Sequence, residues 1–342
     1  MIKTAVAILN WNGLDFLKKF LPSVVKYSNQ PDVNIFVIDN ASSDKSIEFL
    51  KQNYPQIKLV ILDKNYGYAG GYNKGLKQIK AKYYVLLNSD IEVTENWINP
   101  IINLMENNKK ILACQPKILS YNNKEYFEYA GASGGYIDKY GYPFCRGRIF
   151  DTIEKDNHQY DDIKQVFWAT GACLFIDAEK YFKLGGLDND FFAHMEEIDL
   201  CWRINNAGYK IFVNPQSVVY HVGGGTLQKT NPKKTYLNFR NNLYLLYKNL
   251  PDNKLFNICF VRKILDAVAA IKFLFSFKFK DALAVFKAHI NFYKTKKYFK
   301  NKRKLNKEIT VINNHKTILQ KNIIWQYYIK GKKKFNNYTD YL

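Results

Sequence analysis

Short apolar runs alternate with longer amphipathic segments along the first 90 residues of this 342-residue chain. The short runs are rich in β-branched and apolar residues and predict strands, at Thr4–Leu9, Asn34–Ile38, Ile57–Leu62 and Tyr83–Leu87. Apolar residues at helical spacing follow the first run, at Leu14, Leu17, Phe20, Leu21 and Val24. This alternation predicts an α/β fold with a mostly parallel sheet flanked by helices.

Polar residues end or follow these predicted strands. Asp39, Asn65 and Asp90 each come directly or shortly after a strand. In parallel sheets ligands bind at the carboxyl ends of the strands, so these residues predict one binding edge. The glycine-rich segment 65–75 opens a helix near Tyr72–Ile79, and it matches neither a dinucleotide-binding fingerprint nor a Walker A loop.

The rest of the chain divides into three parts. Residues 121–165 have weak periodicity and predict a long excursion over the binding edge. Strands follow at Val166–Ile176, interrupted by Thr170-Gly171-Ala172, and at Lys210–Val213 and Ser217–Tyr220. Residues 226–342 contain no glycine between Gly225 and Gly331 and predict helices.

Three carboxylates stand beside aromatic residues at Glu196, Glu197 and Asp199. On a helix, Glu196 and Asp199 share one face and Glu197 points elsewhere. Carboxylates near apolar rings have raised pKa values, which suits a general base. The alternative is a solvated acidic helix start, which the helix dipole favours.

Asp90 and His221 each end a predicted strand. A carboxylate in this position can hold a divalent cation against a diphosphate, although a turn or helix N-cap is the alternative for Asp90. Most single histidines hold no metal, so His221 has an ordinary structural interpretation as well.

The net charge of +21 is confined to one part of the chain. Residues 1–225 carry 25 Lys and Arg against 25 Asp and Glu, whereas residues 226–342 carry 26 against 5. A strongly basic part predicts an anionic partner, either a membrane surface or nucleic acid. The five scattered cysteines favour a reducing cytoplasm, and no stretch of 18 residues is both apolar throughout and free of charge, which argues against a spanning helix.

Several motifs together resemble the family 2 glycosyltransferases, in their rhamnosyltransferase-like branch, over about residues 3–250. The matching segments are Ile8–Gly13, Val37–Asp44, Asn65–Gly75, Leu86–Asp90, Gly171–Ile176, Gly185–Asp188 and Glu196–Arg203. The resemblance implies a GT-A fold and inverting transfer of a sugar, with rhamnose as a candidate, from a nucleotide-diphosphate donor to a surface glycan. It also implies a divalent cation, Mg²⁺ or Mn²⁺.

The resemblance assigns roles by position. The donor-binding residues are Asn10, Asp39, Asn65 and Asn88, where Asn88 replaces the first Asp of the family's Asp-x-Asp motif. Asp90 and His221 are the metal ligands. Glu197 is the catalytic base, although the family has Asp at this position, and Glu196 and Asp199 are acceptor or secondary carboxylates.

The combined prediction is a catalytic domain at 1–225 and a basic helical extension at 226–342. The extension is expected to dock on an anionic membrane through a stripe of Leu283, Phe286, Ile290 and Tyr293, bordered by lysines and followed by the basic segment 294–307. The protein would then be cytoplasmic and peripheral at the inner face of the cell membrane, extending a glycan acceptor that is lipid-linked in the resembling enzymes. A nucleotidyltransferase and a nucleic-acid-binding protein are the alternatives.

Overall fold

The computed structural model describes residues 2–223 and 231–342. Its largest sheet has nine strands in the order β11-β13-β6-β12-β4-β1-β2-β3, with β5 paired to β13. The strands span Ile2–Asn10 (β1), Val33–Asp39 (β2), Lys58–Ile61 (β3), Ala81–Asn88 (β4), Ile91–Val93 (β5), Ile111–Ser120 (β6), Lys164–Val166 (β11), Cys173–Asp177 (β12) and Lys210–His221 (β13).

Strands β1 to β4 confirm the four strands predicted first, and neighbours among them pair in parallel. β12 runs antiparallel to β4 and β6, so the sheet is mixed beyond β4. The two strands predicted at 210–213 and 217–220 form the single strand β13, with a register shift between Asn214 and Val218.

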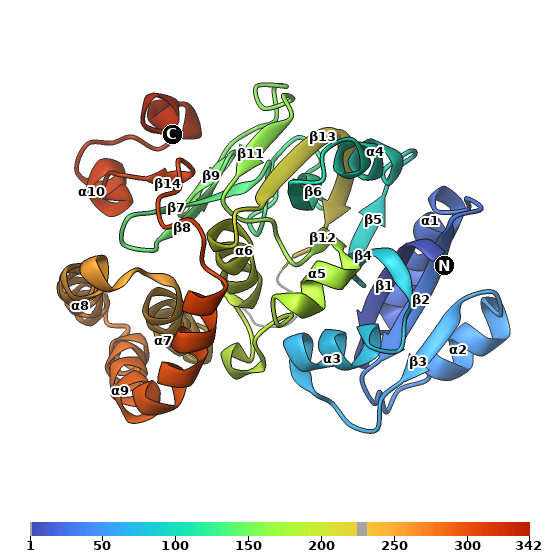
Figure 1. Cartoon of the computed structure of the whole chain (residues 1–342), viewed down its shortest axis with the longest axis horizontal. Coiled ribbons are helices and arrows are strands. Elements are labelled where there is room, and N and C mark those ends of the chain that lie inside the picture. The colour runs from blue at the N-terminus through green and yellow to red at the C-terminus, as the bar shows by residue number, and fades with distance from the viewer. Residues whose placement is uncertain (1, 224–230) are drawn as a thin grey trace.

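Helices cover both faces of this sheet (Figure 1). One core lies under α1 (Leu14–Tyr27), α2 (Ser46–Asn53) and α4 (Asn99–Asn107). The opposite core lies under α3 (Gly67–Leu76), α5 (Ala178–Lys183) and α6 (Glu196–Asn206). The predicted α/β class with helices on both faces is therefore confirmed.

The glycines of α3 bring this helix close to the sheet. A Cβ at Gly75 would lie 2.5 Å from Ile38, and one at Gly71 would lie 2.8 Å from Leu9. The helix therefore begins at Gly67, earlier than predicted, because these glycines pack against the strands instead of forming a loop.

The segment predicted as a long excursion contains most of a second sheet, in the order β10-β9-β8-β7-β14. Its strands span Gly135–Asp138 (β7), Pro143–Cys145 (β8), Arg148–Ile149 (β9), Thr152–Ile153 (β10) and Ile318–Leu319 (β14). Because β14 comes from the basic part of the chain and pairs with β7, the two parts are joined by a sheet.

The basic part is largely helical, as predicted. Its helices are α7 (Pro232–Asn249), α8 (Asp252–Phe275), α9 (Phe279–Glu308) and α10 (Ile323–Tyr328), and a 3-10 helix spans Phe335–Tyr341. Figure 1 shows α7, α8 and α9 together at one end of the molecule, opposite β3 and α2. None of the helices within 2–223 and 231–342 is both long and apolar enough to cross a membrane.

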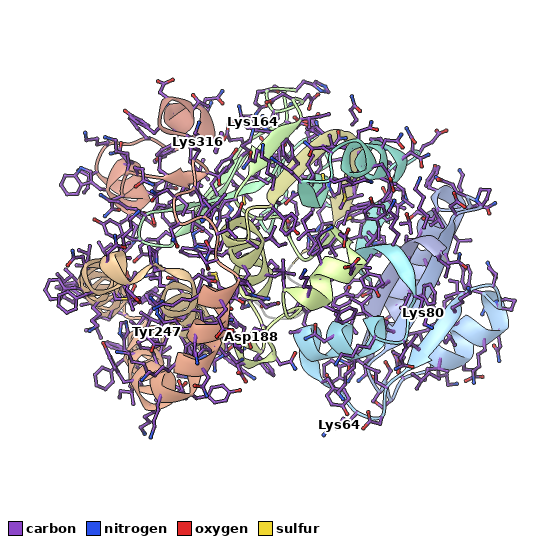
Figure 2. All side chains as sticks on the ribbon, in the orientation of Figure 1. Lys64, Lys80, Lys164, Asp188, Tyr247 and Lys316 are labelled. Carbon is purple, nitrogen blue, oxygen red and sulfur yellow. The ribbon has the colours of Figure 1, made fainter. Side chains whose placement is uncertain are left out.

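The basic helices also share a hydrophobic core with the sheet. Leu243, Leu245 and Leu246 of α7 are buried in the same core as α3, α5 and α6. Figure 2 labels Asp188 between the sheet and these helices, and its carboxylate binds Lys248 of α7 and Lys302 of α9. The predicted boundary at 225/226 lies outside the described residues. It separates a part of the chain with balanced charge from a basic part, but residues of both parts pack in one hydrophobic core.

Candidate active site

The ends of β1 and β2 form the first half of the site. Asn10 Nδ2 donates to Asp39 Oδ2 at 3.0 Å and to Ser42 Oγ at 3.1 Å, while the Ser42 amide donates to Asp39 Oδ1 at 2.9 Å. Asn10 and Asp39 are both fully buried. Asn10 Oδ1 is buried and has no hydrogen-bond partner among the described residues, so it is an acceptor available to a ligand.

Asn40 connects β2 to the turn that starts α3. Its Nδ2 donates to Asn65 Oδ1 at 2.9 Å and its Oδ1 accepts from the Tyr66 amide at 2.9 Å. Asn65 is therefore held against the strand end, close to Asp39. Asn40 was not singled out from the sequence, because an Asn after a strand is an ordinary turn residue.

The end of β4 and the end of β13 form the second half. Asn88 donates its backbone amide to Ala172 O at 2.9 Å, and its side chain is half-buried. His221 Nε2 lies 3.2 Å from Asp90 Oδ1, and His221 Nδ1 lies 3.4 Å from Glu128 Oε2. Asp90 and His221 are thus brought together as predicted, and Glu128 joins them.

The charges in this cluster compensate each other. Burial would lower the pKa of His221, but Asp90 and Glu128 outweigh burial and raise that pKa to about 10. Burial would raise the pKa of Asp90, but the hydrogen bond and charge of His221 lower it. Without a bound cation, the imidazolium is the counter-ion of two buried carboxylates.

The residues fit a divalent cation that is shared with a substrate. Asp90 Oδ1 and His221 Nε2 lie 3.2 Å apart and are an oxygen and a nitrogen of the kinds that could hold a divalent cation such as Mn²⁺. Within 2–223 and 231–342, no three His, Cys, Asp or Glu side chains are grouped as a complete metal cage. Mg²⁺ commonly takes one or two protein ligands and completes its shell with phosphates and water, so two ligands suffice.

The first turn of α6 carries the predicted base. Glu196 Oε2 and Glu197 Oε2 are buried without a hydrogen-bond partner among the described residues. Burial raises the pKa of both carboxyls, and the charge of Glu197 raises that of Glu196 further. Burial without a cation is the environment that keeps a carboxylate basic enough to accept a proton.

Asp199 has a different environment in the same helix. It is fully buried and accepts from Arg203 Nε at 3.0 Å, Lys248 Nζ at 2.8 Å and Asn249 Nδ2 at 2.9 Å. These contacts leave it no free side for an acceptor. We therefore assign Asp199 to the packing of α6 on α7 and leave it out of the proposed site.

Electrostatic effects on two neighbouring groups relate Glu196 and Glu197 to the rest of the site. Tyr68 donates its hydroxyl to Gly171 O at 2.7 Å, and the carboxyls of Glu196 and Glu197 help burial raise the pKa of this hydroxyl. Burial, with smaller contributions from Glu128 and Glu197, raises the pKa of the Cys145 thiol. Glu128 and Glu197 therefore lie within electrostatic reach of the same thiol.

Glu128 is the functional candidate that sequence reasoning missed. It lies before β7, in the segment of weak periodicity, and only the fold brings it to His221. Gly223 is close by, since a Cβ there would lie 2.8 Å from Glu128 Oε1. Gly224 and Gly225, considered with His221 in the sequence, lie outside the described residues.

The described site combines strand ends carrying Asp39 and Asp90, a histidine beside Asp90, and two carboxyls at a helix start that each have one oxygen without a partner among the described residues. Residues 5–163 match the model of the family described as Glycosyl transferase family 2. The chain is a glycosyltransferase with a family 2 domain, as its sequence motifs predict.

One similar sequence and two similar crystal structures agree with this assignment. The N-acetylglucosaminyl-diphospho-decaprenol L-rhamnosyltransferase of Mycobacterium tuberculosis is 23% identical over 226 residues, which are 61% of this chain and 73% of that protein. The crystal structure of GalNAc-T7 with UDP, GalNAc and Mn²⁺ superimposes with a TM-score of 0.57 at 18% identity, over 74% of this chain but only 49% of that chain. The mannosyltransferase PcManGT from Pyrobaculum calidifontis, in complex with GDP-Man and Mn²⁺, gives 0.51 at 14% identity, over 91% of this chain and 86% of that chain.

Proposed function

We propose that this protein is an inverting glycosyltransferase that moves a sugar from a nucleoside diphosphate to a hydroxyl of a growing surface glycan. The observation that carries the proposal is that Glu197 Oε2, like Glu196 Oε2, is buried without a hydrogen-bond partner among the described residues, whereas the carboxylates of Asp39 and Asp90 have partners. A base needs a free lone pair, and Glu197 has one.

Donor binding is assigned to the strand ends. Asp39, fixed by Asn10 and Ser42, accepts from the nucleobase, and Asn65 and Asn88 contact the nucleoside and sugar. Asp90 and His221 would hold Mg²⁺ or Mn²⁺, and a bound cation offsets charge that develops on the departing diphosphate. The similar structures of GalNAc-T7 and PcManGT contain Mn²⁺ together with UDP or GDP-Man, which supports this assignment.

Glu197 is assigned the proton transfer. Its carboxylate takes the proton of the acceptor hydroxyl as that oxygen attacks the anomeric carbon from the face opposite the diphosphate. The new C–O bond forms while the bond to the phosphate oxygen breaks, and the nucleoside diphosphate leaves. One displacement inverts the anomeric configuration, with Glu196 nearby as a secondary carboxylate.

Rhamnose and a lipid-linked acceptor are the proposed substrates. The similar mycobacterial protein is named for transfer of L-rhamnose to a diphospho-decaprenol-linked sugar. A lipid carrier would place this protein in the cytoplasm at the inner face of the cell membrane. Nucleic acid is a weaker partner, because several basic residues of 226–342 are ion-paired within the chain.

A thermal-shift screen tests donor binding. We expect a nucleoside-diphosphate sugar to raise the melting temperature more in the presence of Mn²⁺ or Mg²⁺ than in chelator, because a ligand of the native state stabilises it by mass action. Asp39→Ala should abolish the shift, whereas Asp252→Ala, a change at an exposed carboxylate, should preserve it. No shift with uridine, guanosine or thymidine diphosphate sugars would overturn the proposal.

A further inference from the structure

Helix α8 carries a largely apolar face, with Asn253 and Asn257 at its N-terminal end, that no part of the described chain covers. Its exposed apolar residues are Phe256, Phe260, Ile264, Val268, Ile271, Leu274 and Phe275, with exposed fractions between 47% and 82%. At about 100° per residue they fall within one arc of roughly 120°. Single exposed apolar residues are ordinary, but a face of seven marks an interaction surface.

Lysines border this apolar face on both sides. On the same helical wheel, Lys254 and Lys272 fall beyond one edge of the arc and Lys263 falls beyond the other. The two acidic residues of α8 are engaged elsewhere: Asp252 binds Arg303 and Lys307, and Asp266 is buried against Arg262 and His289. The face is therefore apolar at its centre and cationic at its borders.

Helices α8 and α9 follow each other directly and form a hairpin. The exposed surface of α8 continues around the tip of this hairpin into α9. Phe277 in the connection is 82% exposed and Phe279, the first residue of α9, is 59% exposed. The predicted stripe of α9 is also exposed, at Leu283, Phe286, Ile290 and Tyr293. Lys263 of α8 lies 5.0 Å from the Tyr293 ring, which joins the two helices. At the other border, Lys272 lies 4.4 Å from the Tyr328 ring of α10, next to the exposed Trp325.

We propose that the α8–α9 hairpin is a docking surface for an anionic lipid bilayer. Apolar side chains enter the interface while bordering lysines reach lipid phosphates, which is the chemistry of an interfacial amphipathic helix. Residues 251–300 contain 11 Lys and Arg against 3 Asp. A second copy of the chain would bring the same positive borders, so charge complementarity favours the bilayer.

The structure also corrects which basic residues can serve this surface. Lys302 binds Asp188 and Asp190, Arg303 binds Asp252, and Lys307 binds Asp252 as well. These three side chains of the predicted segment 294–307 hold the chain together and are not free for lipid. The docking lysines are those at the hairpin itself, such as Lys278 and Lys280, which are exposed.

Vesicle co-sedimentation of the full-length protein tests the proposal without any sugar donor. Binding to phosphatidylcholine vesicles that contain phosphatidylglycerol is expected at low salt, with weaker binding at high salt or to pure phosphatidylcholine. Phe277→Ser combined with Phe279→Ser should weaken binding by about tenfold or more. Lys278→Ala should weaken it by about fivefold.

Matched controls are exposed residues at the far edge of the sheet. Ile61→Ser removes a residue that is 52% exposed on β3, and Lys51→Ala removes an exposed lysine of α2, so neither should change binding. Equal binding by hairpin and control variants would overturn the proposal. So would a dimer that the double Phe variant converts to a monomer, because a second copy would then cover the surface.

A second inference concerns the turn before α6. Three non-glycine residues there have positive φ angles, which L-amino acids rarely adopt: Phe192 (φ +66), His194 (φ +69) and Met195 (φ +75). Such a cluster persists only where the surroundings determine it, and it often adjoins a functional site. Glu196 and Glu197 follow immediately.

Asn241 of α7 fixes this turn. Its Nδ2 donates to Phe191 O at 2.8 Å, Ala193 O at 2.9 Å and His194 O at 2.8 Å. Arg240 orients the amide by donating to Asn241 Oδ1 at 3.0 Å and 2.8 Å. We infer that Asn241 is a positioning residue for Glu197, an inference that rests on the proposed function.

Asn242 provides the matched control, because it is equally buried on the same helix but donates to Gly141 O. Asn241→Ala should lower kcat up to about 100-fold, the effect of a displacement near 1 Å, with the donor KM little changed. Asn242→Ala should lower stability but keep kcat. Equal kcat in the two variants would overturn the role of Asn241, whereas an active Glu197→Gln would overturn the base itself.

Discussion

The strand-end site and the α8–α9 hairpin differ in which residues they bury and which they expose. The site buries carboxylates, and no ion pair within residues 2–223 and 231–342 joins Glu196 or Glu197 to a cation. The hairpin exposes phenylalanines, which proteins normally bury. Both arrangements are unfavourable for a folded chain in water, since buried charge must be desolvated and exposed apolar surface must be hydrated.

The two regions differ in the ligand that would offset the desolvation of the carboxyls and the hydration of the phenylalanines. In the proposed function, a substrate hydroxyl would offset the first cost, because it would give the buried carboxylate a hydrogen-bond partner. In the proposed docking, a lipid surface would offset the second cost, because it would remove the phenylalanines from water. Residues that make the isolated molecule less stable thus indicate where ligands bind, and the predictions below test this at each region.

The largest effect is expected at Glu197. Glu197→Gln should lower kcat by about 10²- to 10⁴-fold, the contribution of a general base, while nucleotide binding remains. The same change should raise the melting temperature, because it removes a buried charge without a partner. Steady-state kinetics and thermal denaturation measure the two effects. Full turnover by this variant together with inactivity of Glu196→Gln would show that the neighbouring carboxylate is the base.

Asp90 should come next. Asp90→Asn should lower turnover by more than the ~10- to 100-fold that outer-shell changes cost at metal sites, and nucleotide binding should lose its dependence on Mn²⁺. Isothermal titration with and without chelator measures this dependence. Metal-stimulated binding that survives in the variant would contradict the assignment of Asp90 as a ligand.

Asp199 sharpens the comparison because it is a buried carboxylate with partners. Asp199→Asn should lower the free energy of unfolding by about 3–5 kcal/mol, since it leaves Lys248 buried without its full counter-charge. Chemical denaturation measures the loss, with the exposed Asp252→Asn as a control that should lose less. If Asp199→Asn were as stable as the wild type, Asp199 would not be a stabilising partner of Lys248, and its contrast with Glu197 would not hold.

The pH dependence should be smaller. The folded protein raises the pKa values of Glu196 and Glu197, so the stability associated with their protonated forms is fully present below the ordinary pKa of about 4.3. That stability is lost as pH rises through the raised values. Activity should increase over the same window, because the base must be ionised. Thermal denaturation against pH should show the decline in the wild type and a weaker one in Glu197→Gln, and equal slopes would contradict the raised pKa.

Much of the fold could be predicted from local pattern, and some of it could not. Strands β1, β2 and β4 are continuous buried runs, so their apolar sequences identify them. The second sheet was missed because its strands have two to four residues, too short for a periodic signal. The apolar face of α8 was also missed, because residues such as Leu265 and Phe273 make its remaining surface apolar as well.

Local sequence pattern predicts only part of the candidate site as well. Asn10, Asp39 and Asp90 stand at or just after strand ends on one edge of the sheet, so the order of the strands places them there. Asn65 lies in the turn before α3, where Asn40 binds it. Glu128 and Asn241 act through tertiary contacts with His221 and with the turn before α6, and no local pattern marks them. The free state of Glu197 and the paired state of Asp199 also depend on α7, which the sequence could not place.

Analysis of the products tests the central claim most directly. The protein would be incubated with the donor that the thermal screen selects and with a lipid-diphosphate-linked sugar acceptor, and both products would be identified. The account predicts free nucleoside diphosphate in equal amount to a new glycoside, whose anomeric configuration by NMR is opposite to that of the donor. Release of pyrophosphate, or a glycoside with the donor's configuration, would contradict it.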